Sequence, residues 1–393
     1  MVATTSDARV RAAVTAALRD APASAGAVLT IDLDAVAANW RLLAARSGGA
    51  ECAAVVKADA YGLGADRVGP ALWEAGARTF FVAHPDEALA LRAVLPTARI
   101  AVLHGAPAGA EEELAAAGLL PVLSTPTGID RWAALARRLE RPLPAFIQID
   151  TGMNRLGLEP ADVTALAGDP GRLAGIPVAA WMSHLASPEV PDSPQTDLQL
   201  KRFRQAVAKL PPAPLSLASS SAIFRGGALL FDLTRPGAAL YGVNPTPEVG
   251  NPMRPVVALH GRILQVRTVP PGEGIGYGAT FGTARQTKAA TLSIGYADGF
   301  MRSLSNAGHV LIGGVPAPVA GRVSMDLMTV DATEAPPDAL REGGFATLIG
   351  PHLDVDTVAA AAGTIGYEVL TALGRRYHRV YLGGSGSDDR GRA

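Results

Sequence analysis

Cysteine is almost absent from this sequence, since Cys52 is the only one in 393 residues. A single cysteine excludes an internal disulfide framework and any cysteine-based metal cluster, and it is typical of proteins kept in a reducing cytosol. The seven histidines also lack the spacing of metal ligands. We therefore expect a cytoplasmic protein without a metal site.

An excess of either charge is missing as well, with 35 Lys and Arg against 36 Asp and Glu. Without a net field, neither nucleic acid nor an anionic membrane is an expected partner, and a small molecule is favoured instead. No apolar run reaches the length of about eighteen residues that a bilayer requires. Charged residues interrupt the segment 1–25, so it does not have the apolar core of a signal peptide.

The length accommodates a barrel of about 250 residues and a smaller second domain. Short runs rich in Val, Ile and Ala alternate with helical stretches such as 85–94, 127–139 and 198–210. Eight of these runs are strand candidates: 53–56, 79–83, 100–103, 121–123, 145–149, 178–182, 215–218 and 236–240. Eight strand and helix units predict an α/β fold, a (β/α)8 TIM-type barrel.

The sequence pattern changes after about residue 260. Strand-like segments such as 290–294, 309–312 and 345–349 are separated there by Gly and Pro. These segments predict a C-terminal, mostly β domain. The expected organisation is an N-terminal extension (1–26), a barrel (27–258), the β domain (259–384) and a disordered tail (385–393). The run 27–31 is surplus to the barrel and is a candidate to pair with the β domain.

Polar residues end several of the predicted barrel strands. Lys57 follows the first, Asp150 the fifth, His184 the sixth, and Ser219 and Ser220 the seventh. Barrel enzymes hold their chemistry at these strand ends, although a single polar residue there is more often a strand terminator. Lys57 has two interpretations. It is either a snorkelling lysine or a Schiff-base lysine whose pKa is lowered by burial, and Lys57 alone favours the first.

The segment Val55-Val56-Lys57-Ala58-Asp59-Ala60-Tyr61-Gly62 resembles the lysine motif of the alanine racemase family, which uses pyridoxal phosphate (PLP). Further segments resemble the family's motifs in the family's order: 150–157 (DTGMNRLG), 235–242 (RPGAALYG), 276–280 (GYGAT), 295–299 (GYADG) and 321–326 (GRVSMD). The resemblance extends from about Ala27 to Leu382. It implies a PLP-binding barrel and a β domain, assembled as a homodimer whose active sites are shared between subunits.

The resemblance also implies two proton-transferring groups, because inverting a carbon requires an acid/base on each of its faces. These are Lys57, which would bind PLP, and Tyr277, which would come from the partner subunit. Arg155 would lie beside Tyr277, since a phenol needs cationic neighbours to serve as a base. On composition alone, Tyr277 would be taken for an ordinary half-buried strand tyrosine.

The remaining implied roles concern the cofactor and the substrate. Arg235 would face the pyridine nitrogen and keep it unprotonated, which limits transamination. His184 would lie behind the ring, next to Arg235. The phosphate would be bound by Tyr61, Ser220, the amides of Gly237 and Ala238, and Tyr367. The substrate would meet Arg155 and, from the partner subunit, the Met325 amide and Asp326. Tyr296 would line the entrance. Singly, each of these residues is more often an ordinary surface, turn or hydrogen-bonded residue.

Three positions depart from the family's pattern. Gln148 stands where many members have a carbamylated lysine; it can hydrogen-bond Arg155, but we expect no carbamate there and consider another anion in its place. Ser219 replaces a common asparagine and Ser324 a frequent cysteine, and both retain hydrogen-bonding capacity. A shifted substrate range therefore stays open, because one methyl or hydroxyl changes binding by only about 1–3 kcal/mol.

The expected activity is the interconversion of L- and D-alanine. The resemblance favours a role in supplying D-alanine for cell-wall peptidoglycan over a role in alanine catabolism. The alternatives are a racemase of another small amino acid such as serine, a fold-related PLP decarboxylase, and a non-catalytic PLP carrier. The decarboxylase is expected to use a cysteine of the C-terminal domain, and no cysteine follows residue 52. The carrier would lack the second domain.

Overall fold

The computed structural model describes residues 5–384, so the predicted disordered tail at 385–393 lies outside the described residues. Within this range the chain forms two compact units. The barrel unit contains Val36–Leu240 and Asn244–Met253, and the C-terminal unit contains residues 5–35, 241–243 and 254–384. In the part of the chain that the structure describes, every helix is too short or too polar to span a bilayer.

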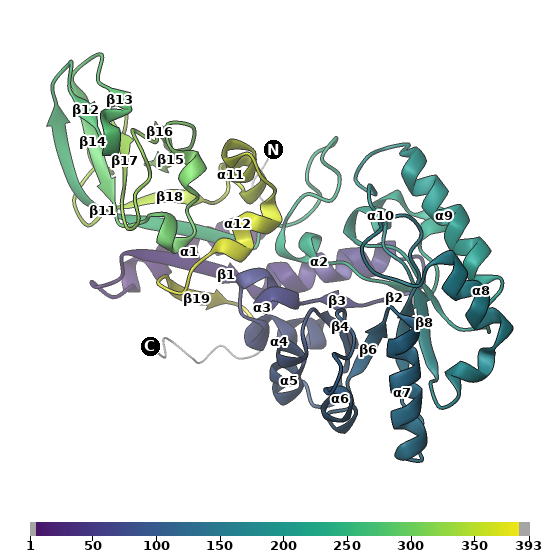
Figure 1. Ribbon diagram of the computed structural model, residues 1–393. Coiled ribbons are helices and arrows are strands. Elements are labelled where there is room, and N and C mark those ends of the chain that lie inside the picture. Colours follow the sequence, from purple (N-terminus) through teal and green to yellow (C-terminus); the bar gives the residue numbers. More distant parts are fainter. Residues whose placement is uncertain (1–4, 385–393) are drawn as a thin grey trace. The chain divides into compact units, whose positions relative to one another are not determined.

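The barrel unit is a nearly closed ring of parallel strands with helices on its outside (Figure 1). Around the ring the order is β2-β10-β9-β8-β7-β6-β5-β4-β3. The bounds are β2 Glu51–Cys52, β3 Ala54–Val55, β4 Thr79–Val82, β5 Arg99–Val102, β6 Leu120–Leu123, β7 Ala145–Gln148, β8 Val178–Met182, β9 Leu215–Ser216 and β10 Leu233–Thr234. Every pairing between neighbours in this ring is parallel.

Only Ala53 separates β2 from β3, and this short run brings the two edges of the sheet together. β2 pairs with β10, whereas β3 pairs with β4. The Ala53 amide donates to the Thr234 carbonyl at 2.9 Å, and the Val56 amide donates to the Phe81 carbonyl at 2.9 Å. One strand position therefore joins both edges, and the predicted (β/α)8 class is confirmed.

The eighth strand was placed wrongly in the sequence. The prediction was 236–240, but the strand is β10 (Leu233–Thr234), and Ala238–Tyr241 forms the 3-10 helix η3. The apolar residues of η3 are buried, as strand residues would be. A short buried apolar run does not distinguish a strand from a helical turn, and Pro236 and Gly237 separate it from β10.

The barrel interior is filled by side chains that alternate along the strands. The rings of Phe81 and Phe146 pack against each other there, with centroids 5.2 Å apart and planes tilted by 56°. The cluster is apolar and buried and comprises Ala53, Val55, Phe81, Ala101, Val122, Phe146, Ala180, Met182 and Leu233. This interior is a packed core, so the chemistry must take place at an end of the barrel.

The helices of the barrel unit begin at recognisable signals. Proline stands at the start of α5, α7, α8 and α9. Proline is tolerated there because the first N–H groups of a helix form no hydrogen bond within the helix. The Thr125 hydroxyl accepts from the Gly128 amide at 3.1 Å and caps α7. The bounds are α2 Leu33–Arg46, α3 Lys57–Gly62, α4 Ala65–Ala75, α5 Pro85–Val94, α6 Glu111–Ala116, α7 Pro126–Arg138, α8 Pro160–Gly168, α9 Pro194–Val207 and α10 Ser220–Arg225, with 3-10 helices η1 Pro170–Leu173 and η2 Gly227–Leu229.

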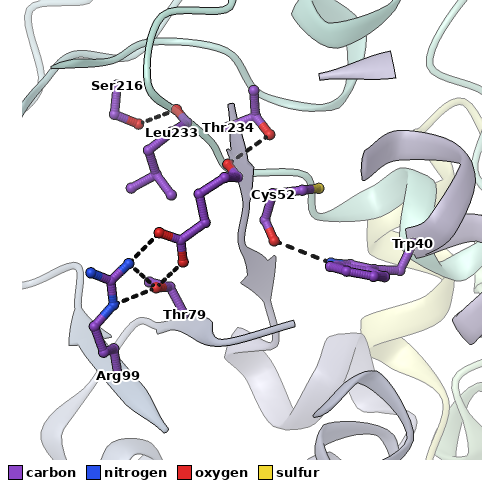
Figure 2. Close-up of polar contacts among 8 residues, drawn as sticks. Trp40, Cys52, Thr79, Arg99, Ser216, Leu233 and Thr234 are labelled. Carbon is purple, nitrogen blue, oxygen red and sulfur yellow. Dashed lines mark hydrogen bonds and ion pairs between the residues drawn. The ribbon is translucent and has the colours of Figure 1, made fainter. Parts of the chain in front are cut away.

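A polar network closes the amino-terminal end of the barrel, where β2, β4 and β5 begin. Figure 2 shows Arg99 turned toward Thr79, and Ser216 bonded to the Leu233 carbonyl. The Glu51 carboxylate accepts from the Thr79 hydroxyl at 2.6 Å and forms an ion pair with Arg99. The Arg99 Nε in turn donates to the Thr79 hydroxyl at 2.9 Å. This network ties three strands at the end opposite to Lys57.

The C-terminal unit is built around the long strand β11 (Val257–Val269), which pairs with β1, β14 and β18. The strand β1 (Ala27–Asp32) is fully buried and lies between β11 and β19. The other strands are β12 Gly274–Ile275, β13 Phe281–Gly282, β14 Thr287–Leu292, β15 His309–Ile312, β16 Val315–Pro318, β17 Met328–Asp331, β18 Phe345–Ile349 and β19 His378–Leu382. The helices are α1 Thr5–Asp20, α11 Val355–Ala362 and α12 Gly366–Ala372, with 3-10 helices η4 Tyr277–Ala279, η5 Tyr296–Asp298 and η6 Arg302–Leu304.

Candidate active site

Lys57 stands at the carboxyl end of the first barrel strand, two residues after β3. Its side chain is partly buried, and this burial lowers the pKa of the ammonium below its ordinary value. The nearby Arg155 guanidinium lowers the pKa further, whereas the Glu87 carboxylate opposes the shift. A lysine with a lowered pKa supplies more of the neutral amine, which is the nucleophilic form.

The backbone that follows Lys57 turns in the left-handed sense. Ala58, Asp59, Ala60 and Tyr61 have φ values of 54°, 54°, 53° and 56°, although none of them is glycine. This turn directs Tyr61 back toward the barrel wall at Gly237. A Cβ atom on Gly237 would lie 2.4 Å from the Tyr61 hydroxyl, so glycine is required for the two to approach.

Ser220 meets the same stretch of backbone from the first turn of α10. Its Oγ accepts from the Gly237 amide at 3.1 Å and from the Ala239 amide at 3.3 Å. Ala238 lies between these two amides. The Tyr61 hydroxyl, the Ser220 hydroxyl and the 237–239 backbone thus form one cradle of small polar groups. Hydroxyls and backbone amides next to a glycine are donors of the kind that bind phosphate.

Arg235 carries a buried charge next to this cradle and is only 4% exposed. Its Nη2 donates to the Ser183 carbonyl at 2.6 Å, and its Nη1 contacts the Ser216 hydroxyl. Burial lowers the pKa of the guanidinium to about 10, so it remains charged at neutral pH. Among residues 5–384, no carboxylate forms an ion pair with it.

His184 follows β8 on the same end of the barrel and is partly buried. Burial, followed by the charges of Arg235, Arg155 and Lys57, lowers the pKa of its imidazole to about 3. The ring is therefore neutral at physiological pH. It can hydrogen-bond or pack against a ring, but it adds no further charge beside Arg235.

Arg155 lies on an exposed loop that is fixed through its backbone. The Asp150 carboxylate accepts from the amides of Gly152, Met153 and Asn154 at 2.8, 3.0 and 3.2 Å. The Gln148 amide donates to the Leu156 carbonyl at 2.9 Å. Gln148 therefore fixes the backbone of Leu156, the residue that follows Arg155.

Two positioning groups were not recognised in the sequence. Gln199 of α9 is fully buried, and its amide joins the loop at Thr151 to the His184 carbonyl at 3.3 and 2.9 Å. Glu87 of α5 accepts a hydrogen bond from the Ala58 amide, next to Lys57. The signal for Gln199 was a polar residue on the buried face of a predicted helix, and the signal for Glu87 was an acidic residue three positions into a helix.

His84 and His104, which were also overlooked, follow the next two strands of the barrel, β4 and β5. Their rings meet edge to face with centroids 4.3 Å apart. Burial and the neighbouring His84 lower the pKa of His104, and the charge of Lys57 adds to this shift. Two histidines therefore stand on the Lys57 end of the barrel.

The other predicted residues lie in the C-terminal unit, on loops and short helices rather than on strands. Tyr277, on η4, is 72% exposed, and Met325 is 53% exposed. The Ala297 amide donates to the Met325 carbonyl at 3.0 Å, which places the loop of Tyr296 against that of Met325. Asp326 forms an ion pair with Arg376 at 2.7 Å, and Tyr367 lies on α12. Tyr277, Tyr296, Met325 and Tyr367 are thus exposed side chains of one unit.

The barrel end thus combines a lysine of lowered pKa, a cradle suited to a dianion and a fixed cation. This combination is typical of a barrel enzyme that holds an anionic cofactor beside a reactive lysine. Comparison with known families agrees. Residues 31–245 match the N-terminal domain of alanine racemase, and residues 256–381 match its C-terminal domain. The chain belongs to the alanine racemase family.

Individual relatives support this membership. An alanine racemase of Methylobacterium nodulans is 52% identical over 93% of this chain and 98% of its own length. A catabolic alanine racemase of Mesorhizobium japonicum is 48% identical over 92% and 95%. A solved alanine racemase of Bartonella henselae with covalently bound pyridoxal phosphate is 43% identical, covering 91% of this chain and 100% of its own, with a TM-score of 0.88.

Proposed function

We propose that this protein is an alanine racemase that binds PLP at Lys57 and interconverts L- and D-alanine. The observation that carries this proposal is the arrangement at the barrel end. There, the left-handed turn after Lys57 brings Tyr61 against Gly237, next to the Ser220 hydroxyl. The covalently bound pyridoxal phosphate of the Bartonella henselae relative supports the assignment of the cofactor.

The residues present fit PLP at both of its ends. A Cβ on Gly237 would lie 2.4 Å from the Tyr61 hydroxyl, so only glycine at this position lets the hydroxyl lie against the backbone that also contacts Ser220, where hydroxyl and amide groups suited to an anion come together. We assign the phosphate to Tyr61, Ser220 and the backbone at Gly237 and Ala238, while the role of Tyr367 stays a prediction from the motif. We assign the pyridine nitrogen to Arg235, whose buried guanidinium has no carboxylate partner among the described residues. When bound, PLP withdraws electrons from the substrate's α-carbon.

Two groups of the protein then move the α-proton. The Lys57 amine acts on one face of the carbon, since its lowered pKa favours the neutral base. The Tyr277 hydroxyl of the partner subunit acts on the other face. Arg155 and the Met325 amide of the partner subunit hold the substrate carboxylate, assisted by Asp326 of the partner subunit. Tyr296 narrows the entrance, which favours a side chain as small as methyl.

The permanent charge of Arg235 directs the outcome of the reaction. A guanidinium beside the pyridine nitrogen does not give up its proton at neutral pH, so the nitrogen stays unprotonated. His184, which is neutral, does not change this balance. The electron demand on the α-carbon is therefore moderate, which favours return of the proton to that carbon over transamination.

The homodimer is part of the proposal. Tyr277, Tyr296 and Met325 are 72%, 41% and 53% exposed, although aromatic and apolar side chains are more often covered. Such a group is typical of a surface that another chain covers. We assign its partner to a second copy of this chain, which completes the active site. We also assign the enzyme to the cytoplasm and to the supply of D-alanine for peptidoglycan.

The proposal is tested by incubating PLP-loaded protein with L-alanine in deuterated water. We expect optical rotation to fall to zero while deuterium enters at the α-carbon, and Lys57→Ala should abolish both. The matched control Lys201→Ala removes an exposed lysine of α9 and should behave as the wild type. Release of carbon dioxide instead would identify a decarboxylase, and PLP binding without any turnover would identify a carrier. Parallel incubations with L-serine test the substrate range.

A further inference from the structure

The turn that carries Lys57 and Tyr61 is a strained piece of backbone. Its four residues Ala58 to Tyr61 all have positive φ, and each left-handed residue other than glycine costs about 1–2 kcal/mol. A turn of this kind persists only where surrounding contacts determine it. Its far end is fixed locally, because the Asp59 carboxylate accepts from the Ala65 amide at 2.7 Å. The near end, beside Lys57, is fixed by a residue from another element.

That residue is Glu87, in the first turn of α5. One of its oxygens, Oε1, accepts from the Ala58 amide at 2.6 Å. The other, Oε2, accepts from the amides of Ala83 and His84 at 2.7 and 3.1 Å. One carboxylate therefore joins the first residue of the strained turn to the end of β4. Bonds from amides to a charged acceptor are stronger than bonds between neutral groups.

Capping of α5 accounts for only part of this arrangement. A glutamate at the third position of a helix commonly accepts from the amide of the N-cap residue, here His84. Such capping does not explain the bond to Ala58, which lies 29 positions earlier on a different element. Oε1 of Glu87 thus connects the helix to the turn that holds Lys57.

We propose that Glu87 is a positioning residue of the active site, whose carboxylate holds the strained turn so that Lys57 and Tyr61 face the same cofactor. This inference rests on the proposed function, because it takes Lys57 as the residue that binds PLP. Glu87 touches neither substrate nor cofactor in this proposal. It acts through the backbone at Ala58.

The substitution Glu87→Gln tests the need for two acceptor oxygens at nearly constant size. An amide has one oxygen, so either Ala58 or the pair Ala83 and His84 loses its acceptor. We expect the Kd for PLP, measured by absorbance titration of the apoprotein, to rise about tenfold or more, since the loss of a hydrogen bond to a charged acceptor changes an equilibrium constant by about this factor. Amide hydrogen exchange at residues 58–61, measured by mass spectrometry, should accelerate. Asp86→Asn removes an exposed charge from the same helical turn and should change neither quantity.

A rescue variant separates positioning from general loss of stability. Ala58→Gly lowers the intrinsic strain of the turn, because glycine accepts positive φ without penalty. We expect Glu87→Gln combined with Ala58→Gly to recover part of the PLP affinity lost in Glu87→Gln. Where Glu87→Gln is too unstable to measure, Glu87→Asp with and without Ala58→Gly provides the same comparison.

The outcomes distinguish this inference from the proposed function. If Glu87→Gln binds PLP as the wild type does, or if exchange accelerates only at residues 83–88 and not at 58–61, Glu87 is a helix cap and the positioning role is wrong. If Lys57→Ala retains the visible absorbance of lysine-linked PLP, the proposed function itself fails. Loss of that absorbance in Lys57→Ala, together with weak PLP binding in Glu87→Gln and rescue by Ala58→Gly, supports both.

Discussion

Arg235 illustrates how a single residue can be costly for stability and still be retained. Burying a guanidinium without an ion-pair partner is unfavourable, and its hydrogen bonds to the Ser183 carbonyl and the Ser216 hydroxyl compensate only in part. The lowered pKa of about 10 reports the same desolvation. A residue held in this way at the end of a barrel is a candidate for function rather than for stability.

Tyr277 allows a test at the scale of one oxygen atom. We expect Tyr277→Phe to retain the visible absorbance of bound PLP and to lower kcat for racemisation by about 10²- to 10⁴-fold, the usual contribution of an acid/base group. The measurement is polarimetry together with an absorbance titration. Tyr377→Phe is the matched control, because the Tyr377 hydroxyl is buried without a hydrogen-bond partner among the described residues. Full activity in Tyr277→Phe would show that Tyr277 is not the second base.

Sequence motifs predicted some of the individual residues at the barrel end, and other residues there became evident only in the structure. Motif resemblance supplied Lys57, Tyr61, Ser220 and Arg235, and the structure places these four at one end of the barrel. Glu87 and Gln199 escaped notice because their roles depend on contacts 29 and 48 positions away along the chain. Local sequence does not encode which distant amide a carboxylate or an amide side chain will meet.

Among the elements, the first barrel strand is the one that closes the ring, because its residues pair with both edges of the sheet. The strands were predictable from alternating apolar runs, and seven of the eight lie where they were expected to within a few residues. The eighth was misplaced because the buried turn η3 has the composition of a strand. Burial was thus predicted correctly there, and backbone geometry was not.

The network around Glu51 leads to a prediction about this strand. We expect Glu51→Ala to lower the free energy of unfolding by about 1–3 kcal/mol, since the buried Thr79 hydroxyl loses its acceptor. The half-exposed ion pair with Arg99 adds little. Urea denaturation followed by circular dichroism measures the change. Glu112→Ala removes a carboxylate from a well-exposed ion pair with Arg138 and should have an effect within about 0.5 kcal/mol. Equal effects of the two substitutions would contradict the role of the network.

For the whole molecule, buried histidines determine part of the response to acid. Burial lowers the pKa of His260 to about 4 from an ordinary value of 6.5, so the unfolded chain binds a proton more readily than the folded one. The stability that neutral His260 provides is complete above about pH 6.5 and is lost as the pH falls toward 4. We expect His260→Leu to flatten the decline in melting temperature between these values. His352→Leu, at an exposed position, should leave the decline as it is in the wild type.

A shared active site makes a second prediction for the assembled enzyme. Lys57→Ala and Tyr277→Phe should each be nearly inactive. When the two are unfolded and refolded together in equal amounts, half of the dimers contain both chains, and one of their two sites combines an intact Lys57 with an intact Tyr277. The mixture should therefore recover about a quarter of the wild-type activity. If mixing restores nothing, each site is built from one chain.

The position of β1 in the sheet of the C-terminal unit affects how this chain can fold during its synthesis. β1 is made early, yet its two neighbours are β11 and β19, and β19 ends at Leu382. A ribosome-bound chain that stops before His378 already contains every strand of the barrel, whereas β1 still lacks the neighbour that completes the other sheet. The barrel can therefore mature while translation continues, and the unit that carries Tyr277 must wait until Leu382 has emerged.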